Sequence, residues 1–266
     1  MDFFQAFVIA VVEGLTEFLP ISSTAHMKFV GPLVGLTHST PFSNMFEVVI
    51  QLAAIGAVVV LYREKFFNLT RMDFFFKLIL GVIPSIIVGL LFKKRIDAAL
   101  DNLHFIAWVM VGGGILLLFV DRIFSHPMFD KEEAIDNRRA FVIGCGQVMA
   151  ILFPGLSRSA ATIITGMAQK LTRHEAAEFS FFLAVPTMFL ASVKSFYDAY
   201  SIHPEVLQGN NIATLLFGML VSFVVALLAI RFFIGFLKKH GFFVWGVYRV
   251  IIGLIILLLI NRGQVV

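Results

Sequence analysis

"EGLTEFLPISSTAH", residues 13–26, places Glu13, Glu17 and His26 inside a chain that is otherwise strongly apolar. The apolar run leading into this stretch is stopped at Pro20, because proline lacks a backbone donor and cannot continue a helix. A helix of about fourteen residues covers roughly 21 Å, which is too short for the ~30 Å hydrocarbon core of a bilayer. The stretch therefore predicts a helix that stops partway through any membrane it enters.

The composition is that of an integral membrane protein. Of 266 residues, 59% are hydrophobic and 14% are charged, and the mean hydropathy is +0.92; a soluble domain has about 25% charged residues. The net charge of +4 comes from lysine and arginine in short loops, so we do not expect a nucleic-acid partner. The single cysteine, Cys145, cannot form an internal disulfide, and we expect it to be a small packed residue.

Six apolar runs are long enough to cross a bilayer. They lie at residues 46–62, 74–92, 104–121, 176–197, 212–234 and 244–261. Two further apolar regions, approximately residues 3–36 and 140–172, are each interrupted by a proline and consist of two short pieces. We interpret these two regions as re-entrant hairpins. The sequence thus predicts one all-α membrane domain over residues 1–266, with six transmembrane helices and two re-entrant helical hairpins.

The two halves of the chain carry similar patterns. "FLPISSTAH" begins a polar turn in the first half, and "FPGLSRSAAT" begins one in the second half. Each turn is followed by an acidic residue at the start of a crossing, Glu47 and Glu178 respectively. One hairpin plus three crossings reverses the direction of the chain. The halves, approximately residues 1–135 and 136–266, are therefore expected to form an inverted-topology repeat.

The distribution of basic residues predicts the orientation. With each hairpin returning to its own side, most lysine and arginine residues fall in the loops of one face. Positively charged loops stay in the cytoplasm, so both termini are expected to be external. The first hairpin then enters from the external face, and the second enters from the cytoplasmic face.

The polar turn after Pro20 has the features of an anion site. Irregular backbone at membrane depth survives only where it is buried in protein or lines a wet cavity. Ser22, Ser23 and Thr24 are good N-cap residues for a second short helix. The start of a helix offers free N–H groups and a positive dipole end, which favour a bound anion. In the second half, Arg158 lies in the equivalent turn, and its guanidinium is suited to phosphate oxygens.

Glu13 and Glu17 are four residues apart and share one helix face. Two carboxylates at low dielectric cannot both stay ionised without a nearby cation. That cation is either Arg158 or a divalent metal such as Mg²⁺, which prefers carboxylates together with substrate phosphates. Ser23 is a residue type that acts as a nucleophile, and His26 is a residue type that acts as a general acid or base. Phosphoryl transfer needs this set of groups.

Other roles for these residues stay open at this point. An intramembrane carboxylate is also a proton-relay group in transporters. His26 taken alone is equally a buried histidine with satisfied hydrogen bonds. Serine in membrane helices commonly caps a helix or packs against a neighbour, which is the simpler role for Ser22 and Ser159.

Two further features have weaker functional meaning. Glu47 and Gln51 share a helix face, where they either line a cavity or form an interhelical hydrogen bond. The run Gly112–Gly114 is expected to permit close packing of two helices.

Two segments carry a family resemblance. "VVEGLTEFLPISSTAHM" (residues 11–27) and "PGLSRSAAT" (residues 154–162) closely resemble the signature regions of the undecaprenyl-diphosphate phosphatase family, also called the bacitracin-resistance protein family. The likeness extends to "FEVVIQL", to "EFSFFLAVP" and to the order of apolar segments, so it covers essentially the whole chain. The sequence departs from the family pattern at Ala25 and Ala160, where glycine is more usual.

The resemblance implies an enzyme of the bacterial inner membrane. Such a hydrolase removes the terminal phosphate from undecaprenyl diphosphate and releases undecaprenyl phosphate, the lipid carrier of peptidoglycan precursors in cell-wall synthesis. Because the antibiotic bacitracin sequesters the diphosphate, the activity confers resistance. The implied partners are the polyprenyl diphosphate lipid and the bilayer, a homodimer is compatible with them, and the active site is expected to open to the external, periplasmic side.

The family motifs also imply roles for individual residues. The implied catalytic residues are Glu17, Ser23, His26 and Arg158, the implied phosphate-binding residues are Ser22, Thr24, Ser157, Arg158, Ser159 and Thr162, and the implied metal ligands are Glu13 and Glu17. The cofactor is a divalent cation, Mg²⁺ or alternatively Ca²⁺. The nucleophile is Ser23, His26 or a water molecule. The alternative function is an inverted-repeat transporter or flippase of the lipid carrier, which differs from the enzyme in releasing no phosphate.

Overall fold

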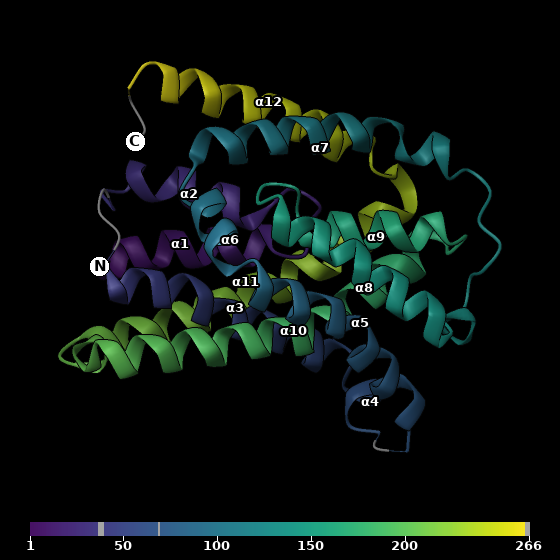
Figure 1. Cartoon of the computed structure of the whole chain (residues 1–266), viewed down its shortest axis with the longest axis horizontal. Helices are drawn as coiled ribbons and strands as arrows, with labels where there is room; N and C mark the ends of the chain where they lie inside the picture. The colour runs from purple at the N-terminus through teal and green to yellow at the C-terminus, as the bar shows by residue number, and fades with distance from the viewer. Residues whose placement is uncertain (37–39, 69, 264–266) are drawn as a thin grey trace.

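The computed structural model describes residues 1–36, 40–68 and 70–263, and the regular elements within these ranges are helices (Figure 1). The α-helices are α1 Phe3–Thr16, α2 Ser23–Leu33, α3 Pro41–Leu61, α4 Arg63–Phe66, α5 Met72–Leu91, α6 Lys93–Leu100, α7 Leu103–Ile123, α8 Asn137–Leu152, α9 Arg158–Ala168, α10 Arg173–Ile202, α11 Asn211–His240 and α12 Phe243–Asn261. Two short 3₁₀ helices, Glu132–Ala134 and Pro204–Leu207, lie in the loops before α8 and α11.

Six helices are long and apolar enough to cross a membrane, namely α3, α5, α7, α10, α11 and α12. They coincide with the six runs predicted from the sequence, which confirms that part of the prediction. Their outward faces are apolar: Leu90, Leu220 and Leu228 are 68%, 63% and 60% exposed. Large apolar side chains can remain exposed on long helices where lipid, rather than water, surrounds them.

The two remaining pairs of helices are shorter than the spans. α1 ends at Thr16, which is earlier than the expected stop at Pro20. The reason is steric. Pro20 is four residues after Thr16, so its ring clashes with the Thr16 carbonyl, and the helical hydrogen bonds do not continue past that residue. Glu17 thus becomes the C-cap of α1 and begins the turn. In the second pair, α8 ends at Leu152, directly before the Phe153–Pro154 break, as expected.

Each break ends in a serine with left-handed backbone. Ser22 has φ 71° and Ser157 has φ 76°, and each is the N-cap of the following helix. Their hydroxyl groups accept hydrogen bonds from the backbone N–H groups of Ala25 and Ala160, at 3.4 and 3.3 Å. Positive φ is uncommon outside glycine and is typical of functional turns. Because the two alanines have ordinary helical backbone, these positions need no glycine.

The short pairs lie between two groups of spans (Figure 1). α7 and α12 pack together on one side, and α3, α10 and α11 pack together on the other. The first helix of each pair packs on a span of the other half of the chain, α1 against α11 and α8 against α5, whereas α2 and α9 contact spans of their own halves, α7 and α10. The start of α1 and the end of α12 lie at the same end of the molecule, and α4 lies at the opposite end (Figure 1).

Glycines allow the closest of these approaches. A Cβ at Gly144 would lie 2.1 Å from the Gly81 carbonyl oxygen of α5, and one at Gly146 would lie 2.0 Å from the Thr165 hydroxyl of α9. Cys145, between them, is exposed. The expectation that this cysteine is a packed residue is wrong, because its two glycine neighbours occupy the helix contacts.

Candidate active site

The two broken turns share a cavity of about 340 Å³. The two turns contribute the polar residues Glu17, Ser22, Ser23, Thr24, Ser157 and Arg158 to its lining, and α3 adds Gln51. Apolar side chains of α3, α6, α8 and α10 complete its walls. Groups more than 130 positions apart in the sequence therefore converge on one space of the size that binds a small polar ligand.

Arg158 and Glu17 form a buried ion pair across this cavity. Arg158 Nη2 donates to Glu17 Oε1 at 2.7 Å, and the two side chains are 14% and 8% exposed. Arg158 Nη1 donates to the Ser180 carbonyl oxygen of α10 at 3.0 Å. Within the described part of the chain, the buried Arg158 Nε has no acceptor. Arg158 Nη2 also lies 3.4 Å from Met188 Sδ, so three partners hold the guanidinium in place.

Glu17 also contacts Ser23. The Ser23 hydroxyl donates to Glu17 Oε2 at 2.6 Å, so the two carboxylate oxygens of Glu17 face different partners. Both Ser23 and Glu17 are buried, at 8% exposure each. A hydroxyl within hydrogen-bond distance of a carboxylate is the arrangement of a nucleophile and its general base.

Glu13 lies one helical turn before Glu17 and is fully buried. Its carboxyl group is a close neighbour of the Glu17 carboxyl group. No residue that the structure describes donates a hydrogen bond to either of its oxygens. An unpaired buried carboxylate is costly, so a proton or a cation is needed beside it. Glu13 does not line the cavity.

His26 points away from the cavity, toward the backbone of its own turn. Its Nδ1 lies 2.7 Å from the Ser22 carbonyl oxygen, and its Nε2 lies 2.8 Å from the Tyr248 hydroxyl of α12. Because a carbonyl oxygen can only accept, we assign the proton to Nδ1, and Nε2 then accepts from tyrosine. The His26 and Tyr248 rings are also nearly parallel, with an interplanar angle of 6°. The histidine therefore orients the Ser22 peptide.

Ser159 and Thr162 connect the turns instead of lining the cavity. The Ser159 hydroxyl donates to the Leu19 carbonyl oxygen at 2.9 Å, which joins the second turn to the first. The Thr162 hydroxyl lies 2.6 Å from the Ser180 hydroxyl, which joins α9 to α10. Both side chains are fully buried.

The acidic residues at the starts of the crossings have separate partners. Of the two polar residues on one face of α3, Gln51 lines the cavity, whereas Glu47 forms an ion pair with Lys28 of α2 at 3.7 Å. Glu178 of α10 pairs with Lys65 at 3.3 Å and does not line the cavity.

Arg249 is a buried residue of this region that our sequence reasoning missed. Its side chain is 0% exposed. Its guanidinium donates to carbonyl oxygens of both broken turns: to Pro20 at 3.1 Å, Leu156 at 2.7 Å and Gly155 at 2.8 Å, and its Nε donates to Met110 of α7 at 3.2 Å. Helix ends leave carbonyls without partners. Arg249 satisfies those of both turns at once.

A signal for Arg249 was present in the sequence. A charged residue within a predicted span marks a functional position by default, and Arg249 lies within the run 244–261. A second missed element is α6, whose Ile96 and Leu100 contribute to the cavity wall. The same short helix exposes Lys93 and Lys94 next to the cavity.

Gly113 makes room for Arg249, which leads to a stability prediction. A Cβ at Gly113 would lie 2.3 Å from Arg249 Nη2, whereas one at Gly112 would have no neighbour within 4 Å. Gly113→Ala is expected to lower the stability by about 1–3 kcal/mol, as overpacking does. Gly112→Ala is the matched control and is expected to leave stability unchanged. The melting temperatures of the two variants in the same detergent test this, and equal values would contradict the assigned role of Gly113.

Comparison of the chain with known proteins identifies its family. A family model described as bacitracin resistance protein BacA matches residues 6–255. The chain belongs to the BacA family. The matched region contains both broken turns and Arg249. The expected family resemblance is therefore confirmed over nearly the whole chain.

Individual relatives match over similar lengths. The chain is 48% identical over 259 residues to a protein named undecaprenyl-diphosphatase from Flavobacterium psychrophilum, covering 97% of this chain and 96% of the relative. It is 44% identical over 279 residues to one of the same name from Porphyromonas gingivalis, covering 99% and 98%. It is 39% identical over 266 residues to one from Bdellovibrio bacteriovorus, again covering 99% and 98%. All three belong to bacteria, as the BacA family resemblance implies.

Proposed function

We propose that the protein is an undecaprenyl-diphosphate phosphatase of the bacterial membrane, which releases inorganic phosphate and undecaprenyl phosphate and confers bacitracin resistance. Its full-length relatives carry the name undecaprenyl-diphosphatase. The observation that carries the proposal is the position of Glu17, whose two oxygens contact the Ser23 hydroxyl and the Arg158 guanidinium in one cavity. A hydroxyl, a base and a phosphate clamp are the groups that phosphoryl transfer requires.

The diphosphate headgroup binds in the cavity and the polyprenyl chain extends into lipid. Arg158, whose side chain lines the cavity, donates to the terminal phosphate. The backbone N–H groups at the starts of α2 and α9, next to Ser23 and Ser157, add donors and positive dipole ends. The side chains of Ser22, Thr24 and Ser157 line the same space. Ser159 and Thr162 act on the phosphate indirectly, by fixing the second turn.

Ser23 is the nucleophile and Glu17 is its base. As the Ser23 oxygen forms a bond to the terminal phosphorus, its proton moves to Glu17 Oε2, which already accepts its hydrogen bond at 2.6 Å. The bond from phosphorus to the bridging oxygen breaks, and undecaprenyl phosphate leaves with the electron pair. Glu17 passes the proton it took from Ser23 to the departing undecaprenyl phosphate. Water then attacks the phosphorus of the phosphoserine, Glu17 takes a proton from that water, the bond from phosphorus to the Ser23 oxygen breaks, and Glu17 returns the proton to that oxygen as inorganic phosphate leaves. His26 is a positioning residue, because it contacts the Ser22 carbonyl and not the reacting hydroxyl.

Arg158 stabilises the charge that spreads over the transferred oxygens. Its two terminal nitrogens are fixed by Glu17 and by the Ser180 carbonyl, so the guanidinium is oriented before substrate arrives. A preorganised donor needs no rearrangement at the moment of reaction, which is the main source of catalysis in this chemistry.

The carboxylates fit a divalent cation. Glu13 is buried and accepts no hydrogen bond from the described residues, and it neighbours Glu17, so the pair offers oxygen ligands of the kind that Mg²⁺ and Ca²⁺ prefer. Glu13 and Glu17 would hold the ion. When bound, the ion neutralises phosphate charge.

The membrane topology belongs to the same proposal. The α1–α2 and α8–α9 pairs are re-entrant hairpins, and the halves 1–135 and 136–266 are inverted repeats. Support comes from the matching N-cap serines, Ser22 and Ser157, and from the crosswise packing of α1 on α11 and α8 on α5. Both termini are external. The cavity opens to the external side, because α6 lies in an external loop and forms part of the cavity wall.

Phosphate release in detergent tests the proposed activity. The purified protein is expected to release phosphate from undecaprenyl diphosphate with Mg²⁺, and to lose at least about 100-fold of its rate in excess EDTA, with recovery on adding Mg²⁺ back. A transporter or flippase needs two compartments and releases no phosphate. Absence of release with Mg²⁺ or Ca²⁺ would therefore favour transport, and full activity in EDTA would remove the metal from the mechanism.

A further inference from the structure

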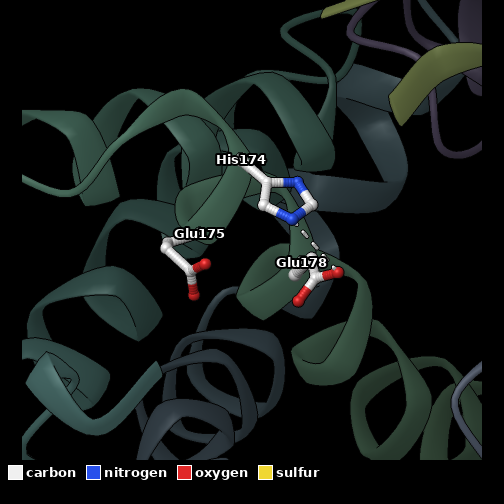
Figure 2. Close-up of side chains that lie close together, drawn as sticks. All are labelled: His174, Glu175 and Glu178. Carbon is white, nitrogen blue, oxygen red and sulfur yellow. Dashed lines mark ion pairs between the residues drawn. The ribbon is translucent and has the colours of Figure 1, made fainter. Parts of the chain in front are cut away.

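A second group of ligand-type side chains lies at the start of α10, and none of its residues lines the cavity. His174, Glu175 and Glu178 each offer one ligand atom, and these three atoms lie within 4.8 Å of one another (Figure 2). His174 Nε2 is 3.6 Å from Glu178 Oε1. Glu178 precedes Met188 of the cavity wall by ten residues, which is roughly 15 Å along a helix. The group is therefore separate from the site built on Glu13 and Glu17.

Glu175 is the residue that points to a bound ligand. It is 9% exposed, yet across residues 1–36, 40–68 and 70–263 no group donates a hydrogen bond to its carboxylate or forms an ion pair with it. Its backbone N–H donates to the N-cap residue Thr172, which fixes the residue in the first turn of α10. A buried carboxylate without partners carries a desolvation cost that a cation would offset.

The nearby basic side chains do not form an ion pair with Glu175, because they are already paired with other carboxylates. Lys65 Nζ lies 2.7 Å from Glu132 Oε2 and 3.3 Å from Glu178 Oε2. Arg71 Nη2 lies 2.6 Å from Glu132 Oε1. The Glu178 carboxylate thus directs Oε2 to the lysine and Oε1 to His174. Among the residues that the structure describes, no basic side chain lies within ion-pair distance of Glu175.

We propose that His174, Glu175 and Glu178 form a second metal site that takes a divalent transition metal such as Zn²⁺. An imidazole nitrogen with two carboxylate oxygens suits zinc better than Mg²⁺ or Ca²⁺, which prefer all-oxygen shells. Two ligand atoms each about 2.1 Å from a tetrahedral ion lie roughly 3.4 Å apart. The 3.6 Å between His174 and Glu178 is close to that separation, and the i, i+4 spacing is one that helical metal sites use.

A small movement of Glu175 completes the protein ligands. Its carboxylate oxygen is within 4.8 Å of the other two ligand atoms, so rotation about its side-chain bonds is sufficient to bring it onto the ion. Water supplies the fourth position, because His174 is only partly buried. The ion anchors the first turn of α10, the helix whose Ser180 carbonyl orients Arg158.

Zinc stoichiometry tests this site. Tag-free protein is stripped with chelator, equilibrated with Zn²⁺ in the presence of excess Mg²⁺ to occupy all-oxygen sites, freed of unbound metal and assayed for zinc by mass spectrometry. The unsubstituted protein is expected to hold one more equivalent than Glu175→Gln and His174→Gln. The matched control is Glu133→Gln, an exposed glutamate of the neighbouring loop, and it should keep the full zinc content.

The outcomes separate this site from the proposed phosphatase, because the readout is bound zinc and not turnover. Equal zinc in the unsubstituted protein, Glu175→Gln and His174→Gln would overturn the proposal, as would a comparable loss in Glu133→Gln. If Glu175→Gln elutes as aggregate, His174→Gln alone decides, since its side chain is 32% exposed and its replacement leaves no buried charge.

Discussion

Replacing Arg158 by lysine is expected to lower kcat/KM for undecaprenyl diphosphate by about 10³-fold or more while the protein stays folded. Arginine holds Glu17 with one nitrogen and the Ser180 carbonyl with another, and its side chain also lines the cavity that the substrate enters. Lysine preserves the positive charge beside Glu17, but its single ammonium cannot occupy these three directions together. The loss is expected in kcat, because the guanidinium acts on charge that develops during transfer.

A matched control uses an arginine outside the cavity. Arg173 Nε forms an ion pair with Asp121 at 2.6 Å, and the arginine side chain is 41% exposed. Arg173→Lys is expected to keep turnover within about twofold, because exposed ion pairs contribute at most about 1 kcal/mol. Steady-state phosphate release and melting temperature are measured for both variants. Turnover of Arg158→Lys within tenfold of the unsubstituted protein, at equal folded fraction, would show that the phosphate clamp is elsewhere.

Ser23→Ala is expected to lower kcat by about 10³-fold or more, because it removes the attacking oxygen and leaves the rest of the cavity in place. The substitution is small, and Ser23 makes its side-chain hydrogen bond to Glu17 alone among the described residues. Ser43→Ala is the matched control, because Ser43 is equally buried but caps α3 away from the cavity, and near-normal turnover is expected.

Detection of the phosphoserine intermediate on Ser23 complements the measurement of kcat. Acid quenching of the unsubstituted enzyme during turnover of ³²P-labelled substrate should leave label on Ser23, and Ser23→Ala should leave none. If phosphate takes its oxygen from ¹⁸O water without any labelled protein, and Ser23→Ala keeps most of its rate, water is the nucleophile and Ser23 only helps to orient it.

The membrane-spanning part of the fold was predictable because it depends on local composition. Each crossing needs about twenty apolar residues, and the predicted and observed spans differ by only a few residues at their ends. The two breaks were predictable for the same reason, since a proline acts on its own neighbours. The first break nonetheless starts earlier than expected, at Thr16, because the effect of Pro20 reaches back four residues.

The arrangement of the site depends on tertiary packing, which sequence spacing does not determine. The i, i+4 relation of Glu13 and Glu17 indicates a common face, but not that Glu17 alone meets Arg158. Likewise, a histidine next to three hydroxyl residues suggests acid/base chemistry, whereas the structure turns His26 toward Ser22 and Tyr248. The contribution of α6 was not predictable, because an eight-residue helix in a loop has no periodic signal of its own.

The guanidinium of Arg249 has a consequence for biogenesis. α12 follows every other helix in the described chain, so both broken turns leave the ribosome before the side chain that caps their carbonyls. Until that last helix packs against the two turns, their carbonyl oxygens lack the Arg249 donor. Catalytic competence therefore arises only at the end of translation, and chains that stall before α12 should be recognised and removed by membrane proteases.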